Sequence, residues 1–112
     1  MLSFNVEDKN AVTIIHIHGE LYHDKVPELE RIWDIQLSKP SSTIAINCGN
    51  LIYIDSPAIG ALVRFLNEAM KKGKKLVFFD LNPDIRKLFD TARLERFFVI
   101  ASKETFEANY LK

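Results

Sequence analysis

The first nineteen residues carry an alternation of apolar and polar side chains that is typical of β-strands. Phe4 and Val6 alternate with polar neighbours, residues 8–10 are turn formers, and the largely apolar segment AVTIIHIHG follows at residues 11–19. Alternation with a period of two places successive side chains on opposite faces of a strand. The pattern therefore predicts two strands joined as a hairpin.

The next segment has apolar residues at helical spacing and is predicted to be a helix. Asp24 is placed to cap its first turn, and Pro27 lies in that turn, where its missing N–H is harmless. The helix is expected to end by Pro40. Its apolar stripe is formed by Val26, Leu29, Trp33 and Leu37.

A second and clearer helix is predicted to follow the sequence DSP and to stop at Gly73. One apolar stripe runs along it, and we expect that stripe, with Leu62 near its centre, to face a sheet. The stripe is formed by Ile59, Leu62, Val63, Leu66 and Met70.

The remaining apolar runs complete an alternation of strands and helices. TIAIN at residues 43–47 lies between turn formers at residues 39–42 and 49–50, which suits a strand buried on both faces. LVFFDL and RFFVI are predicted strands, Pro83 starts a third helix, and ETFEANYL forms a last short one. The predicted order is β-β-α-β-α-β-α-β-α. It indicates an α/β fold with a mixed, partly parallel sheet in one domain over residues 1–112.

Composition and charge narrow the classes of function. The 112 residues are 47% hydrophobic and 27% charged, which is typical of a folded soluble domain. Fifteen basic and fifteen acidic residues cancel, so no overall field would attract nucleic acid or a membrane surface. One cysteine, no secretory signal and no long apolar stretch indicate a cytoplasmic protein without a membrane span.

The junction IYIDSPAIGALV is the most informative segment for function. Ser56 is expected to be the N-cap of the second helix, with Pro57 at the first helical position. One interpretation is that Ser56 only caps, which stabilises a helix by about 1 kcal/mol. The other is that Ser56 lies at the rim of the sheet, where the helix N-terminus could carry a phosphate of about −2 charge. Asp55 beside it would repel that phosphate.

Three other groups of residues are interpreted as structural. His16 and His18 share one strand face and His23 lies nearby, but no cysteine or carboxylate completes a metal site, so we expect them to meet solvent. Cys48 is expected to be a packing residue. The lysines of KKGKK at residues 71–75 are expected to complement a helix C-terminus.

Aromatic residues are mostly assigned to the core, with one exception. Trp33 and the pair Phe78 and Phe79 belong to predicted buried positions. Phe65 lies to one side of the second helix's stripe. It could form an apolar shoulder near Ser56 with Ala58 and Ala61, or pack under a neighbouring loop; both alternatives stay open.

No recognised catalytic motif is present, because the chain lacks a glycine-rich phosphate loop, a Cys-x-x-Cys pair and a nucleophile elbow. The segment IDSPAIGALV instead resembles the D-S-x-G-φ-G-x-L signature, where φ is apolar, of STAS domains, which anti-sigma factor antagonists share. Four further segments occur in the same order and at the same spacing as in the family: GEL at residues 19–21, TIAIN leading to LIYIDS, KKGKKLVFFDLNPDIRKLF and RFFVIASKETFEA. The resemblance covers nearly the whole chain.

This resemblance implies that Ser56 is the residue that the family phosphorylates. The expected partners are an anti-sigma factor with serine kinase activity, which the unmodified protein captures to release a sigma factor, and a phosphoserine phosphatase. Because the kinase would bind ATP and magnesium, no cofactor of this chain is expected. Alternative functions are a scaffold subunit of a stress-signalling assembly and a small-ligand-binding domain.

The expected docking surface combines the Ser56 turn with the loop before the first helix. Two departures from the family pattern lie in it: Pro57 and Ala58 replace the usual serine and glycine, and Tyr22 replaces an acidic residue that often follows G-x-L. The expected partner-binding residues are Tyr22, His23, Asp24, Asp55, Ser56, Pro57, Ala58, Ile59 and Phe65.

Overall fold

The computed structural model describes residues 2–111 and contains a five-stranded sheet in the order β1-β2-β3-β4-β5. β1 pairs antiparallel with β2, whereas the pairs β2–β3, β3–β4 and β4–β5 are parallel. The predicted mixed sheet is therefore confirmed. The strands are β1 (Ser3–Lys9), β2 (Val12–Leu21), β3 (Thr43–Ile54), β4 (Lys75–Phe79) and β5 (Val99–Ala101).

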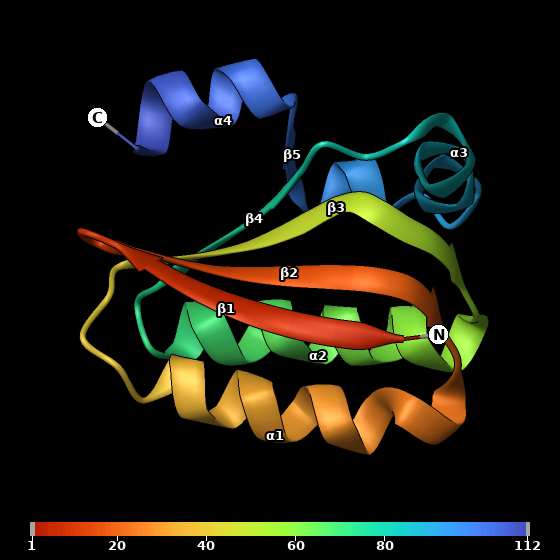
Figure 1. Cartoon of the computed structure of the whole chain (residues 1–112), viewed down its shortest axis with the longest axis horizontal. Helices are drawn as coiled ribbons and strands as arrows, with labels where there is room; N and C mark the ends of the chain where they lie inside the picture. The colour runs from red at the N-terminus through yellow and green to blue at the C-terminus, as the bar shows by residue number, and fades with distance from the viewer. Residues whose placement is uncertain (1, 112) are drawn as a thin grey trace.

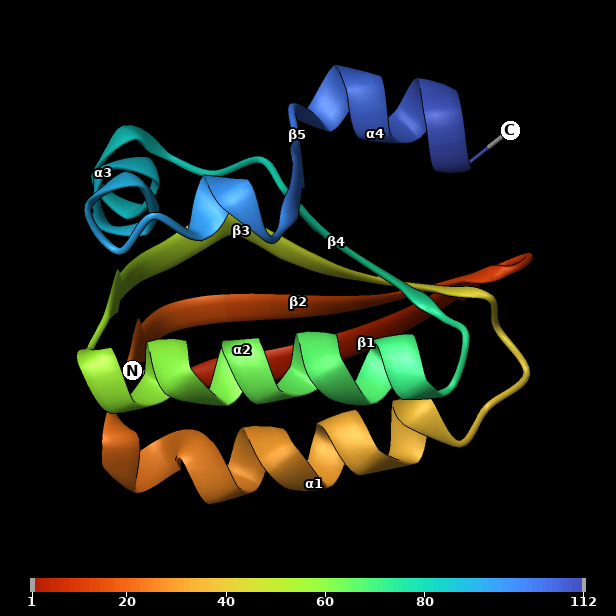
Figure 2. The same ribbon diagram turned by 180° about the vertical axis from the view of Figure 1, so that it is seen from behind.

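Helices cover both faces of this sheet. Figures 1 and 2 show α1 and α2 side by side on one face and α4 on the other. Two short 3-10 turns, at His23–Lys25 and Leu94–Arg96, interrupt the connections, but the predicted order of strands and helices is confirmed. The helices are α1 (Val26–Leu37), α2 (Ser56–Lys71), α3 (Pro83–Thr91) and α4 (Lys103–Tyr110).

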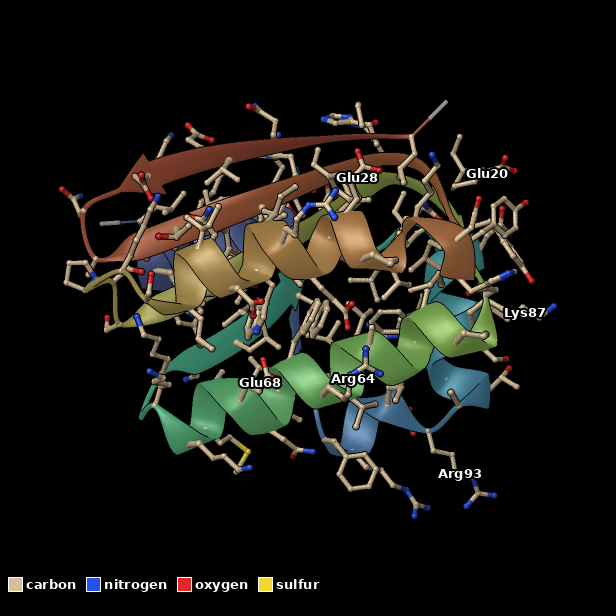
Figure 3. All side chains as sticks on the ribbon, turned by 90° about the horizontal axis from the view of Figure 1, so that it is seen from below. Glu20, Glu28, Arg64, Glu68, Lys87 and Arg93 are labelled. Atoms are coloured by element: carbon tan, nitrogen blue, oxygen red, sulfur yellow. The ribbon has the colours of Figure 1, made fainter. Side chains whose placement is uncertain are left out.

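The larger core lies between the sheet and the helices α1, α2 and α3. Trp33 is fully buried there, and its ring stacks on Phe65 with 4.5 Å between centroids. The indole Nε1–H donates to Glu68 Oε1 at 2.8 Å, so the one polar atom of this ring has a partner. Figure 3 shows Arg64 and Glu68 on the side of α2 that faces α1, and Arg64 pairs with Glu30 at 2.6 Å.

The buried face of α2 differs from the predicted stripe. Leu62 is buried as expected, but Ile59 and Leu66 are only half-buried, and Val63 and Met70 are exposed. Three alanines on the inner face let the backbone of α2 approach the elements it packs against, while Ile59 and Leu66 lie at the edges of the contact. The buried residues of α2 are Ala58, Ala61, Leu62, Phe65 and Ala69.

A second, smaller core lies under α4 on the opposite face of the sheet. Phe106 of α4 stacks on Phe79 of β4 with 4.0 Å between ring centroids. Both Phe78 and Phe79 are buried, one in each core, because successive residues of β4 point to opposite faces. Their predicted core positions are confirmed.

Two local predictions are wrong. Asp24 does not cap α1: it lies within the 3-10 turn, and the N-cap is Lys25, which makes no side-chain cap bond. Gly49 and Asn50 do not end the third strand, because β3 continues to Ile54 through a register shift against β2. A Cβ at position 49 would displace the Asp80 carboxylate, so the glycine here allows close packing rather than forming a turn.

No helix formed within residues 2–111 combines the length and the apolar composition that a bilayer crossing requires.

Candidate functional site

Ser56 is the first residue of α2 and lies directly after the central strand β3. Figure 1 shows this junction at one end of the molecule, where β3 turns into α2. The Ser56 side chain is exposed, and no hydrogen bond within residues 2–111 engages its hydroxyl. A carboxyl end of a parallel strand is the usual place for ligands and partners on an α/β sheet. The expected place of Ser56 at the rim of the sheet, after a central strand, is thus confirmed.

The expected capping role of Ser56 is wrong, because Asp55 is the N-cap of α2. Asp55 has an extended backbone, and its Oδ1 accepts a hydrogen bond from the Ala58 N–H at 3.0 Å. Aspartate caps about as well as serine, and here the helix begins one residue earlier than predicted. As a result, Pro57 occupies the second helical position and the Ser56 hydroxyl is left free.

The second carboxylate oxygen of Asp55 holds the loop before α1. Oδ2 accepts a hydrogen bond from the His23 backbone N–H at 2.9 Å and lies 3.2 Å from His23 Nδ1. The Asp55 backbone N–H also donates to the Leu21 carbonyl at 3.2 Å. One half-buried aspartate therefore connects the end of β2, the 3-10 turn and the start of α2.

These contacts stabilise the ionised form of Asp55. Partial burial alone would raise its pKa, but the backbone N–H groups of His23 and Ala58, together with the His23 side chain, outweigh burial and lower the pKa. Asp55 is therefore an anion at neutral pH, immediately before the free hydroxyl of Ser56.

An exposed aromatic pair adjoins this turn, and only one of its members, Tyr22, was among the expected partner-binding residues. Tyr22 and Tyr53 are about 40% exposed each, and their rings lie 5.6 Å apart between centroids. Ile52, beside Tyr53 on β3, is also exposed. β3 extends here beyond its partner β4, whose last paired residue, Phe79, lies opposite Asn47. The apolar neighbours of Tyr53 in the sequence, Ile52 and Ile54, did not indicate its exposure.

The structure places most, but not all, of the expected partner-binding residues on this surface. Tyr22, His23, Asp24, Ser56 and Pro57 are exposed and Ile59 is half-buried.

Ala58 and Phe65 are buried within the chain and are therefore not exposed on this surface. Ala58 faces the core from the first turn of α2, and Phe65 packs on Trp33. Of the two alternatives for Phe65, packing is correct, although it packs against α1 rather than under a loop. We define the docking surface as Tyr22, His23, Asp24, Tyr53, Ser56 and Pro57.

The histidines do not converge on one site. His16 Nε2 lies 3.0 Å from Glu7 Oε1, and its Nδ1 lies 2.8 Å from Asn47 Nδ2 on the sheet face. His18 stacks near His16, as expected for one strand face, but both are only partly exposed. His23 binds Asp55 instead. Among residues 2–111, no three His, Cys, Asp or Glu side chains are grouped so that they could hold a metal ion.

Cys48 is fully buried in the larger core, as its predicted packing role requires. Burial raises the pKa of its thiol far above the ordinary value, and the nearby Asp80 carboxylate adds to this effect. The thiol therefore stays protonated.

Comparisons with known proteins identify the family and the fold. The family model of the STAS domain matches residues 3–108. The anti-sigma-B factor antagonist of Staphylococcus epidermidis is 29% identical over 93 residues, which cover 77% of this chain and 86% of the relative.

Two solved structures share the fold. An anti-sigma factor antagonist from Mycobacterium paratuberculosis superposes with a TM-score of 0.81 at 17% identity, covering 90% of this chain and 86% of that one. The Bacillus cell fate determinant SpoIIAA in its phosphorylated form superposes with a TM-score of 0.69 at 22% identity, covering 92% and 95%.

Proposed function

The chain belongs to the STAS domain family, and we propose that within this family it acts as an anti-sigma factor antagonist. Unmodified, it captures an anti-sigma factor that is also a serine kinase, and so releases a sigma factor. Phosphorylation of Ser56 prevents this capture, and a phosphoserine phosphatase restores it. The chain works in the cytoplasm, without nucleic acid, membrane or a cofactor of its own.

The observation that carries this proposal is the free hydroxyl of Ser56 beside a separate cap. Because Asp55 supplies the cap bond to Ala58, Ser56 can be modified without removing a structural hydrogen bond of α2. The names of the relatives support the same function, and one structural neighbour is described in a phosphorylated form.

The chemistry assigned to this chain is that of a substrate. The Ser56 Oγ would attack the γ-phosphoryl group of a nucleoside triphosphate, form the new P–O bond and lose its proton, while the nucleoside diphosphate leaves. The partner kinase would supply the base and the metal ions, which position and stabilise the transferring group. Exposure of Ser56 at the rim of the sheet gives a kinase access to it.

Phosphate at this position would oppose an interface that closes over the turn. It adds about −2 charge beside the Asp55 anion. An interface must strip water from that charge, and a buried charge without a partner costs several kcal/mol. The neighbouring Tyr22 and Tyr53 offer the amphipathic aromatic surface that is enriched in protein interfaces.

Affinity capture from the native cytosol tests the proposal. We expect the unaltered chain and Ser56→Ala to retain the same kinase-type partner, and Ser56→Asp to retain less of it. Capture of that partner in equal amounts by the Ala and Asp variants would contradict the switch. Size-exclusion chromatography of the purified chain provides a second check, because a scaffold subunit would assemble into large particles instead.

A further inference from the structure

The ring of His23 is held at the edge of the docking surface by the carboxylate of Asp55. Its Nδ1 lies 3.2 Å from Asp55 Oδ2, and its own backbone N–H donates to the same oxygen at 2.9 Å. The ring is 72% exposed, so it can turn towards solvent or towards a neighbouring group. Among residues 2–111, no other side chain makes a hydrogen bond or ion pair with this carboxylate.

A phosphate on Ser56 would create a second anion next to Asp55. The helix N-terminus stabilises anions, but one oxygen of Asp55 already takes the Ala58 N–H there. A cation beside these two neighbouring anions would reduce the repulsion between them.

The charged groups around this point are few. Asp24 and Lys25 lie on the 3-10 turn with His23, and Figure 3 shows Glu20 of β2 and Lys87 of α3 at the same end of the molecule. Tyr22 and Tyr53 carry the other titratable side chains of this surface. Neither lysine makes an ion pair with Asp55, whereas the His23 ring already contacts it.

We propose that His23 is the counter-charge for a phosphoserine at position 56, and that it couples phosphorylation to the 3-10 turn His23–Lys25. The inference rests on the proposed function only in taking Ser56 as the modified residue. A neutral imidazole has one N–H donor, whereas an imidazolium has two, one for Asp55 and one for the phosphate. Phosphorylation would thus favour the protonated ring, and the protonated ring would favour the phosphate dianion.

Because His23 belongs to the 3-10 turn, phosphorylation of Ser56 would also change the charge of that turn. The imidazolium keeps its contact with Asp55 through one N–H and donates the other to the phosphate, while the two backbone N–H bonds to the carboxylate remain in place. The turn therefore stays attached to Asp55 while the charge at this edge of the docking surface changes.

Phosphorus NMR of the purified chain tests the proposal without any partner. Phosphoserine is installed at position 56 during translation, and the pH midpoint of the phosphate's second ionisation is measured. We expect this midpoint to rise by about half a pH unit in His23→Gln, a modest change because solvent screens an exposed pair. The glutamine keeps the backbone N–H that binds Asp55, so folding is retained.

Lys25→Gln is the matched control, because it removes a cation from the same turn without an ion pair to Asp55. We expect it to leave the midpoint unchanged. An unchanged midpoint in His23→Gln, or an equal shift in both variants, would overturn the role of His23. This readout needs no kinase or sigma factor, so its result is independent of the proposed function. The midpoint can stay unchanged although partner capture depends on phosphorylation, and it can shift although partner capture does not depend on phosphorylation.

Discussion

The carboxylate of Asp55 accepts a hydrogen bond from the backbone N–H of His23 across 32 positions of sequence, at 2.9 Å. The same side chain caps α2 through Ala58. The loop after β2 and the start of the helix that carries Ser56 are therefore fixed relative to one another by one residue.

Asp55→Ala should destabilise the fold more than Ser56→Ala. Removing Asp55 leaves the N–H groups of Ala58 and His23 without their acceptor, and we expect a loss of about 1–3 kcal/mol in the free energy of unfolding. Ser56→Ala removes a hydroxyl that makes no such bond and should cost less than about 0.5 kcal/mol. Denaturant melts of both variants measure the difference. The opposite order would show that Ser56, not Asp55, is the cap.

The lowered pKa of Asp55 should also appear in the pH dependence of stability. A carboxyl group whose pKa is lower in the folded state binds its proton more tightly when unfolded, so its contribution is complete above the unfolded pKa. That contribution is lost as pH falls through the folded pKa. Melts between neutral and strongly acidic pH should therefore show a shallower loss for Asp55→Asn than for the unaltered chain. Glu7 and Asp8, whose pKa values are also lowered, contribute equally to both proteins. If the two proteins lost stability in parallel as pH falls, Asp55 would not contribute to the acid sensitivity of the fold.

The orientation of α2 can be tested with two side chains of similar size. Leu62 is 1% exposed and Met70 is 66% exposed. Leu62→Ala should cost about 2–5 kcal/mol, as for other buried leucines, and Met70→Ala less than about 1 kcal/mol. Comparable losses in chemical denaturation would mean that the helix is rotated towards the stripe that the sequence indicated.

Gln36 offers a stabilising substitution. The residue is 5% exposed, and its side-chain Oε1 has no hydrogen-bond partner within the described residues. A buried acceptor without a partner costs free energy, so Gln36→Met, which keeps the unbranched shape, should stabilise the fold by about 0.5–1 kcal/mol. Thermal and denaturant unfolding would measure the gain. A loss of stability would imply that Gln36 makes a contact through an ordered water.

The order of elements could be predicted because the spacing of apolar residues alternates clearly along the chain between two residues, as in strands, and about 3.6 residues, as in helices. Ser56 could be placed at the start of α2 for the same reason, since DSP interrupts this spacing. The cap could not be predicted, because Asp55 and Ser56 are adjacent and both cap well. Asp55 is favoured as the N-cap by its hydrogen bond with His23, a distant residue that the pairing of β2 with β3 brings close.

The buried face of α2 was mispredicted for a different physical reason. Long apolar side chains form the more obvious stripe, but the buried face of α2 combines three alanines with Leu62 and Phe65. Phe65 is buried because Trp33 of α1 lies opposite it, a relationship between two helices that local periodicity does not contain. The exposure of Tyr53 likewise depends on where β4 ends beside β3.

The most direct test of the phosphorylation switch is calorimetric titration of the kinase-type anti-sigma factor from the same cell with two forms of this chain. One form carries serine at position 56 and the other carries phosphoserine, and both are first compared by circular dichroism to establish that they are equally folded. We expect the phosphoserine form to bind at least about tenfold more weakly, equivalent to about 1.4 kcal/mol, because the interface must desolvate the added charge. Ser56→Asp, which adds only one charge, should fall between them. Equal affinities of the serine and phosphoserine forms would contradict the switch.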